Sequence, residues 1–267
     1  MLIGKQLHLN ITHLYPQNMN LYGDLGNIIT LKKRLEWRGY KITINNVEIG
    51  ESINNLQTDI YFFGGGQDKD QVKVFKDLVK TKKHKLIEDI EKGIPLLAIC
   101  GGYQLLGKYF LDSDGNKIEG IAIAEFETIA PSADMKQRAV GNLVTEILNP
   151  EIYDHYTKLR TLVGFENHSG RTRLNDLEKI KPLGKVLYGF GDNEDKISDG
   201  MIYKNVIGTY MHGSVLPKNP HLADFIIKKA LEIKLNDQNT NLDELDDRIE
   251  INAHRRILEI CKIKIKN

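Results

Sequence analysis

This chain of 267 residues contains few cysteines and has almost no net charge. Its only two cysteines, Cys100 and Cys261, are far apart, which does not make a disulfide framework or a cysteine metal site. A free thiol in a reducing compartment is therefore expected. The 37 basic and 36 acidic residues leave a formal charge of +1, which gives no electrostatic footprint for nucleic acid or an anionic membrane.

Long apolar runs, repeats and low-complexity tracts are absent as well. No run is long enough to span a bilayer, and the first ten residues lack the pattern of a signal peptide. We therefore expect a cytoplasmic protein. With 41% hydrophobic residues the chain can bury a sizeable core, and its length suits one α/β domain with additions.

Apolar runs alternate with helical periodicity over the first hundred residues. Asp24 is expected to cap a helix that starts at Leu25 and ends at Gly39, and a second helix is predicted over Asp70–Lys92. The predicted strands are Gln6–Tyr15, Tyr40–Val47, Thr58–Phe63 and Pro95–Ile99. Alternating strands and helices are typical of a mainly parallel sheet with helices on both faces.

Shorter strands follow beyond residue 110. They are predicted at Ala124–Ile129, Gly141–Glu146, Thr161–Glu166, Lys185–Gly191, Met201–Tyr203 and Val206–Met211. Helices are predicted at Asn219–Leu235 and Leu242–Lys262, with the polar loop Asn236–Asn241 between them. The expected fold is thus α/β, a mainly parallel sheet flanked by helices with extra short antiparallel strands. Residues 1–235 would form the main domain and residues 236–267 a C-terminal helical extension.

The most informative segment is Pro95–Gln104, where an apolar strand ends at Cys100 and two glycines follow. A strand that turns sharply into a helix exposes the residue at the turn on a strained elbow. Backbone N–H groups at the start of the helix favour a thiolate there. A buried, inert cysteine is the alternative, but the paired glycines and Gln104 favour a nucleophile.

Two further segments can serve this thiol. The buried strand at Phe63 opens into consecutive glycines, and the amides of Gly65, Gly66 and Gly101 could form an oxyanion hole. Their spacing matches neither the P-loop nor the dinucleotide fingerprint, which argues against phosphate binding. His212 ends an apolar strand and is followed by glycine, so it could act as the base and acid.

His168 is the other histidine in a glycine-flanked segment, Gly164–Arg171, which we interpret as a polar loop near the site. We expect His168 to support the residues of the site rather than to take part in the reaction.

Together these segments resemble the class I glutamine amidotransferases, in which a cysteine attacks the side-chain amide of glutamine. The resemblance implies a flavodoxin-like fold, Cys100 as nucleophile, His212 as general base and acid, and release of ammonia through a thioester. One position departs from the family pattern. Members usually have a glutamate two residues after the histidine, and here Ser214 occupies that position. The sequence therefore resembles the branch typified by cobyric acid synthase, and a Cys–His dyad is expected.

Longer motifs narrow the resemblance to amidotransferase subunits of lipid II isoglutaminyl synthases. These motifs are Leu21–Ile29, Gly164–Thr172 and Gly208–Asn219. The resemblance implies a heterodimer with a Mur-ligase-like synthetase, which would bind ATP and Mg²⁺ and amidate the α-carboxylate of D-glutamate in a lipid-linked acceptor. This chain itself would need no metal or cofactor, and the complex would reach the inner face of the membrane.

The same resemblance suggests how glutamine is held. Lys136–Gly141 matches the segment that carries a substrate-binding arginine, which makes Arg138 the candidate and Arg171 the competitor. A guanidinium suits this role because it grips a carboxylate with two hydrogen bonds. Gln104 could also reach the substrate. Two other hypotheses remain open: an amidotransferase for another carboxylate, such as a corrinoid, and a non-catalytic partner-binding module.

Overall fold

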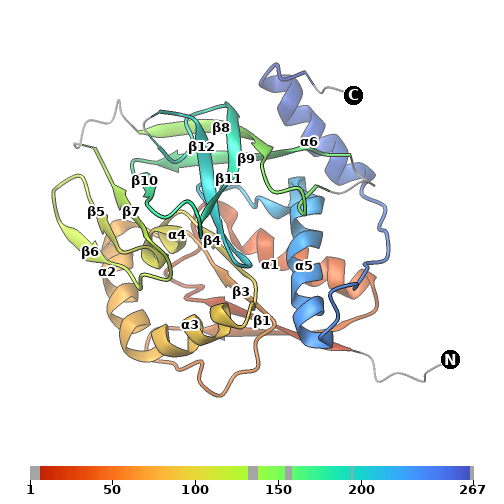
Figure 1. Ribbon diagram of the computed structural model, residues 1–267, viewed down its shortest axis with the longest axis horizontal. Helices are drawn as coiled ribbons and strands as arrows, with labels where there is room; N and C mark the ends of the chain where they lie inside the picture. The colour runs from red at the N-terminus through yellow and green to blue at the C-terminus, as the bar shows by residue number, and fades with distance from the viewer. Residues whose placement is uncertain (1–6, 132–137, 154–157, 194, 265–267) are drawn as a thin grey trace.

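The computed structural model describes residues 7–131, 138–153, 158–193 and 195–264. Nine strands form the main sheet: β1 (His8–Leu14), β2 (Lys41–Val47), β3 (Ile60–Phe63), β4 (Leu96–Ile99), β8 (Ala139–Ile147), β9 (Thr161–His168), β11 (Lys181–Tyr188), β12 (Ser198–Tyr203) and β13 (Val206–Thr209). Their spatial order is β2-β1-β3-β4-β13-β12-β11-β8-β9 (Figure 1). Neighbours from β2 to β13 are parallel, and neighbours from β13 to β9 are antiparallel. The expected α/β fold is confirmed, with a sheet that is half parallel and half antiparallel.

A smaller sheet lies beside the main one. It has the order β10-β7-β5-β6 and consists of β5 (Tyr109–Leu111), β6 (Lys117–Glu119), β7 (Phe126–Ile129) and β10 (Arg171–Leu174). The β5 and β6 strands flank the turn that begins at Asp112. The short strands expected after residue 110 therefore belong to two different sheets.

Helices flank the main sheet. They are α1 (Leu25–Trp37), α2 (Asp68–Asp77), α3 (Lys83–Glu91), α4 (Gly101–Leu106), α5 (Pro220–Leu235) and α6 (Arg248–Ile260), with the 3₁₀ turns η1 (Leu21–Gly23) and η4 (Leu216–Lys218). Figure 1 shows α2 and α3 on one side of the parallel strands, and α1 with α5 on the other. Within the described residues, no helix has the length and apolarity needed to cross a membrane.

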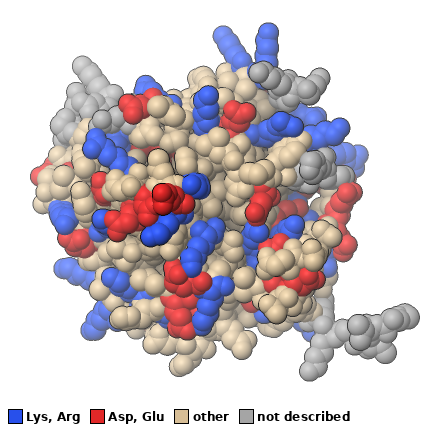
Figure 2. Space-filling view, in the orientation of Figure 1, with Lys and Arg blue, Asp and Glu red and all other residues tan. Residues whose placement is uncertain are grey.

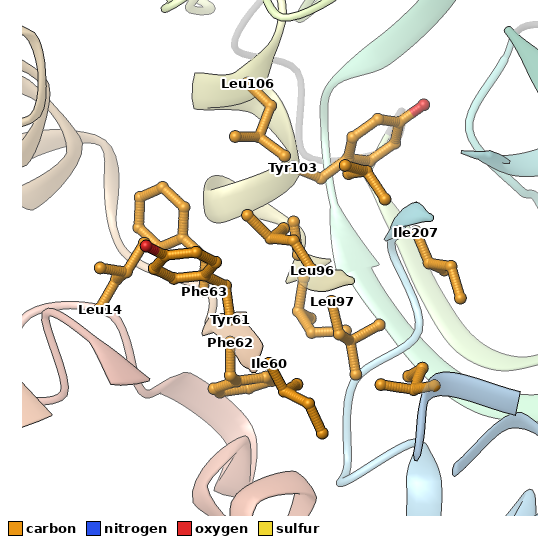
Figure 3. Packing of buried hydrophobic residues seen from close by; sticks show 14 of the residues in the cluster. Leu14, Ile60, Tyr61, Phe62, Phe63, Leu96, Leu97, Tyr103, Leu106 and Ile207 are labelled. Atoms are coloured by element: carbon orange, nitrogen blue, oxygen red, sulfur yellow. The ribbon is translucent and has the colours of Figure 1, made fainter. Parts of the chain in front are cut away.

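The central strands form because their sequences are largely apolar. Every residue of β3, β4 and β13 is buried, as expected for strands covered on both faces. Figure 3 shows side chains from β3 and β4 packed together, with Tyr103 of α4 approaching from above. A Cβ on Gly208 of β13 would lie 2.4 Å from the ring of Tyr103, so glycine lets α4 pack closely over this strand. This packing fixes the start of α4.

The predicted helix over Asp70–Lys92 is interrupted. A π-helical turn, η2 (Leu78–Lys82), separates α2 from α3. The turn directs the ammonium of Lys82 inward, where it contacts Asp77 and lies 4.5 Å above the ring centre of Tyr15. A buried ammonium needs such partners. The contacts of Lys82 therefore account for the π-helical turn, which the helical periodicity of the sequence does not predict.

Two other predictions need correction. His168 is the last residue of β9, so the predicted polar loop over Gly164–Arg171 is largely the end of β9 and the start of β10. The last helix starts at Arg248 rather than at Leu242. The carboxylate of Asp247, just before that helix, binds the buried guanidinium of Arg34 on α1.

This guanidinium is 1% exposed and also binds both carboxylate oxygens of Asp224 on α5. Arg34 thus joins α1, α5 and the start of α6. Leu258 of α6 and Cys261, just after the helix, pack against Val144 of β8 and Val163 of β9. The division of the chain at residue 235 stays a prediction.

Figure 2 shows basic and acidic side chains interspersed over the face in view. This face has no large area of one sign, in keeping with the nearly neutral composition.

Candidate active site

Cys100 occupies a strained elbow between β4 and α4. Its backbone has φ 47° and ψ −105°, and its amide donates a hydrogen bond to the carbonyl of Thr209 on β13. A non-glycine residue in such a conformation costs about 1–3 kcal/mol. The chain can turn this tightly because Gly102 has no side chain: a Cβ there would lie 2.6 Å from the carbonyl oxygen of Phe63. The expected elbow geometry is therefore present.

His212 reaches the elbow from the neighbouring strand. The pairing of β13 with β4 is parallel and places Thr209 opposite Ile99, so both chains leave the sheet at the same edge. His212 is then fixed by backbone hydrogen bonds in both directions with Phe165. A Cβ on Gly65 would lie 2.5 Å from the imidazole and 3.5 Å from the Cβ of Cys100, which shows how closely these residues meet.

A third residue, Asp24, completes this group. Its carboxylate is fully buried, and Oδ1 lies 3.3 Å from Nδ1 of His212. Oδ2 accepts a hydrogen bond of 2.8 Å from the amide of Gly65. A carboxylate on Nδ1 fixes the tautomer and orientation of an imidazole. Asp24 thus occupies the position of an orienting acid, supplied from the segment before α1.

Asp24 lies at the N-cap position of α1 as predicted, but its side chain does not cap the helix. Asp24 makes no side-chain bond to the first turn of α1, and the amide of Leu25 donates instead to Asn20. Ser214, in the position where the family usually has its glutamate, donates through Oγ to the carbonyl of Gly23. Ser214 therefore supports the turn that carries the acid.

The electrostatics of His212 favour its charged form. Burial alone would lower the pKa of His212, but the negative charges of Cys100 and Asp24 and their hydrogen bonds raise it to about 10. Nε2 has no hydrogen-bond partner among the described residues, although the thiol of Cys100 lies close enough to raise the pKa of the ring. Such loose contacts are common in catalytic pairs before substrate binds. The arrangement suits an imidazole that holds a proton beside the sulfur of Cys100.

The elbow opens into a cavity of about 600 Å³, large enough for a small polar substrate. The residues that line it are Leu21, Tyr22, Gly66, Gln67, Lys69, Gln71, Cys100, Gln104, Phe110, Arg138, Asn167, His168 and Ser169. The predicted nucleophile and both predicted substrate-binding residues therefore share one cavity.

Arg138 is held at this cavity by the end of β9. Its Nε donates to Oδ1 of Asn167 at 2.6 Å, and Nη2 donates to the carbonyl of the same residue at 3.2 Å. Neither bond uses Nη1. Lys136 and Gln137, from the same predicted segment, lie outside the described residues. Arg171 lines a different cavity and donates to the carbonyls of Ser169 and Gly170, so the geometry favours Arg138 over Arg171 as a substrate ligand.

Gln104 is buried at the back of the cavity. Its amide nitrogen donates to the hydroxyl of Tyr210, and its oxygen accepts from Gln71. Both polar ends of Gln104 are therefore engaged within the protein. These bonds favour a role in shaping the cavity wall.

The glycine loop follows the prediction only in part. The amide of Gly65 is occupied by Asp24, so Gly65 is not available as an oxyanion donor and its predicted role is corrected. The backbones of Gly66 and Gly101 approach closely, since a Cβ on Gly101 would lie 3.0 Å from the nitrogen of Gly66. These two amides remain the candidates for stabilising an oxyanion.

His168 supports the cavity from behind. Its ring stacks on Tyr210 with 3.8 Å between ring centres, and its nitrogens face the carbonyl of Gly170 and the carboxylate of Glu166. Burial lowers the pKa of His168, although Glu166 opposes the effect. A neutral, fixed imidazole fits the supporting role expected from the sequence.

A buried acid, Asp199, lies on β12, the neighbour of β13. Asp199 accepts a hydrogen bond from Thr209, the residue whose carbonyl binds the amide of Cys100. Burial raises the pKa of Asp199 to about 7. This acid fixes the end of β13 and has no counterpart among the expected site residues.

A comparison with known proteins identifies the family of this chain. The model of the CobB/CobQ-like glutamine amidotransferase domain matches residues 10–220. The chain belongs to this amidotransferase family. Its glutamine amidotransferase character, expected from the sequence, is confirmed.

Two relatives match along nearly their whole length. The chain is 38% identical over 251 residues to the GatD subunit of lipid II isoglutaminyl synthase (glutamine-hydrolyzing) from Staphylococcus aureus strain N315, covering 94% of this chain and 95% of the relative. It is 41% identical over 226 residues to the subunit of the same name from Streptococcus pneumoniae R6, covering 85% and 82%. A probable cobyric acid synthase from Methanothermobacter thermautotrophicus is 29% identical over 185 residues, which cover 33% of that protein.

Solved structures support the fold of this amidotransferase. A crystal structure of a glutamine amidotransferase superimposes with a TM-score of 0.54 at 14% identity, covering 82% of this chain and 98% of the other. A Thermotoga maritima glutamine amidotransferase gives 0.52 at 14% identity, covering 96% and 94%.

The site residues that sequence reasoning missed are Asp24, Asn167 and Tyr22. The sequence did contain one indication that Asp24 is functional, because it lies among glycines in one of the motifs that resemble the family. Its position just before a helix, however, favoured the interpretation as a helix cap. Asn167 and Tyr22 also lie in such motifs, without a residue type that marks their roles.

Proposed function

We propose that this amidotransferase is the glutaminase subunit of a lipid II isoglutaminyl synthase. The observation that carries the proposal is the meeting of Cys100, His212 and Asp24 beside a cavity that also contains Arg138. The two relatives that match nearly end to end both bear that enzyme's name, which supports the acceptor.

The chemistry follows from the positions of these groups. With the α-carboxylate of glutamine on Arg138, Sγ of Cys100 attacks the side-chain amide carbon. The amides of Gly66 and Gly101 stabilise the oxyanion that forms. His212 gives its proton to the leaving nitrogen, the carbon–nitrogen bond breaks, and ammonia leaves a glutamyl thioester. His212 then takes a proton from water, which attacks the thioester and releases glutamate and the thiol.

Ammonia then passes to a second protein. That partner is a Mur-ligase-like synthetase, which binds ATP and Mg²⁺ and activates the α-carboxylate of D-glutamate in the peptidoglycan stem. The amidotransferase itself uses no cofactor in this scheme. The complex works in the cytoplasm at the inner face of the membrane, where the partner holds the lipid-linked acceptor. Glutamine turnover by the isolated subunit is suppressed until the partner binds, since unpartnered hydrolysis would waste glutamine.

The test of the nucleophile compares Cys100→Ala with Cys261→Ala, because the second free cysteine is also buried, follows the end of α6 and does not line the cavity. We expect glutamate release by the complex to vanish in Cys100→Ala and to persist in Cys261→Ala. A glutamine-like chloroketone should label the wild type and Cys261→Ala at one site, and should not label Cys100→Ala. Equal glutamate release by both variants would refute the assignment, and so would labelling of Cys100→Ala.

The acceptor is tested separately by supplying the complex with ATP and glutamine labelled at the amide nitrogen. We expect the label in the α-carboxamide of lipid II. Label in a corrinoid or another carboxylate would favour the alternative that similarity to the cobyric acid synthase suggests. A protein without any Cys100-dependent labelling or turnover would instead be a partner-binding module.

A further inference from the structure

Tyr22 lies at the mouth of the cavity in an unusual backbone conformation. It is the middle residue of η1 and has φ 53° and ψ 27°, the left-handed region that a tyrosine rarely adopts. Its side chain is 46% exposed. An exposed tyrosine gains little from burial, so its own contacts must offset the unfavourable backbone. Those contacts connect two functional parts of the site.

The ring of Tyr22 contacts His212. The two ring centres are 4.9 Å apart and the planes meet at 70°, an edge-to-face arrangement. His212 itself is fully buried. Tyr22 therefore separates one side of the imidazole from solvent and restricts its rotation about the side-chain bonds. Asp24, only two residues further along the chain, contacts Nδ1 of the same ring.

The hydroxyl of Tyr22 reaches the other part of the site. It accepts a hydrogen bond of 2.7 Å from Nδ2 of Asn167. Oδ1 of Asn167 in turn accepts from Nε of Arg138 at 2.6 Å. An amide that donates at one end and accepts at the other transmits a fixed orientation, because neither end can turn without losing a partner. The chain Tyr22–Asn167–Arg138 thus sets the direction of the guanidinium.

We propose that Tyr22 is a positioning residue with two separable effects: its hydroxyl orients Arg138 through Asn167 for glutamine binding, and its ring holds His212 for proton transfer. This inference rests on the proposed glutaminase function. One side chain then couples the ligand of the substrate carboxylate to the imidazole, although the two lie on different segments of the chain.

The experiment separates the hydroxyl from the ring. Tyr22→Phe removes only the hydroxyl, Tyr22→Ala removes both groups, and Tyr188→Phe is the matched control because Tyr188 is 47% exposed on β11 and does not line the cavity. Glutamate release is measured with the synthetase complex. Alkylation of Cys100 is measured with a glutamine-like chloroketone, which carries the α-carboxylate, and with iodoacetamide, which does not.

For Tyr22→Phe we expect the KM for glutamine to rise by about twofold to tenfold, the range given by loss of one hydrogen bond. The rate of chloroketone labelling should fall by the same factor. The value of kcat and the rate of iodoacetamide labelling should stay within about twofold of wild type, since the ring remains. For Tyr22→Ala we expect kcat to fall as well, and the pH profile of iodoacetamide labelling to shift.

A double-mutant cycle tests the route. In an Asn167→Ala background, Tyr22→Phe should have no further effect on KM, because the hydroxyl has lost its connection to Arg138. The proposal is overturned if Tyr22→Phe has the KM of Tyr188→Phe, or if it slows both alkylating agents equally. The proposed function fails by a different result, the absence of Cys100-dependent glutamate release in the wild-type complex.

Discussion

Asp24→Asn tests the orienting acid with little change of shape. The asparagine oxygen can still accept from the amide of Gly65, which Asp24 binds at 2.8 Å. Its amide group, however, turns a donor toward Nδ1 of His212, where the carboxylate Oδ1 lies 3.3 Å away. The imidazole loses both its negative partner and its preferred tautomer.

The expected size of the effect follows from that contact. A buried hydrogen bond to a charged group contributes about 1.5–3 kcal/mol, and its loss corresponds to a fall in kcat of about 10- to 150-fold. Because the contact is long, we expect the lower half of this range. Asp24→Ala should lose the same activity and also leave the amide of Gly65 without its partner, which lowers the free energy of unfolding by about 1–3 kcal/mol more.

The pH dependence supplies an independent readout. His212 has a pKa of about 10 in the folded protein, above its ordinary value of 6.5. Its protonated form therefore stabilises the fold fully below pH 6.5, and this contribution is lost as the pH rises through about 10. Loss of the proton also removes the acid for the leaving ammonia, so kcat should fall on the alkaline side. In Asp24→Asn the pKa of His212 is lower, and the alkaline fall should start at a lower pH.

The assay is glutamate release by the complex across the pH range, with thermal unfolding measured in parallel. Asp246→Asn is the control, because Asp246 is exposed and pairs with Arg248 on the surface. A kcat for Asp24→Asn equal to that of Asp246→Asn, with an unmoved alkaline limb, would refute the role of Asp24. Because the bond to Gly65 is retained, we expect Asp24→Asn to unfold near the temperature at which the wild type unfolds. A much lower unfolding temperature would point to a structural role for Asp24.

Two further predictions concern arginines. Arg138→Ala should raise the KM for glutamine by about 10- to 150-fold, because a charged hydrogen-bonding partner of the carboxylate is lost, whereas Arg171→Ala should leave KM unchanged; equal KM values in steady-state assays would contradict the choice between them. Arg34→Met should lower the free energy of unfolding by about 3–5 kcal/mol, because the buried carboxylate of Asp247 would lose the guanidinium that it binds, whereas Asp224 is only half-buried and keeps Arg38. The exposed Arg256→Ala should change it by less than about 0.5 kcal/mol, and denaturant titration that finds equal losses would show that the buried network contributes little.

The elbow at Cys100 could be predicted from the sequence because the features that form it lie close together along the chain. Cys100 follows an apolar strand and precedes two glycines, and each of these features acts within a few residues. The same is true of His212, which lies three residues beyond the end of β13. By contrast, the bond between Asp24 and His212 joins residues 188 positions apart, and only the order of strands in the sheet brings them together. From the sequence alone, an aspartate before a helix is better explained as a cap.

The topology of the sheet nevertheless explains why the predicted site residues and the missed ones lie together. In the order β1-β3-β4-β13, four neighbouring strands run parallel, so their carboxyl ends share one edge. Asp24, Gly65, Cys100 and His212 follow these four strands in that same order, and ligands in open α/β sheets bind outside this edge. A buried strand followed by glycines or by a reactive side chain is visible in a sequence. The segment after β1 is longer, and its acid lies ten residues beyond Leu14, which hides it from a local pattern but not from the fold.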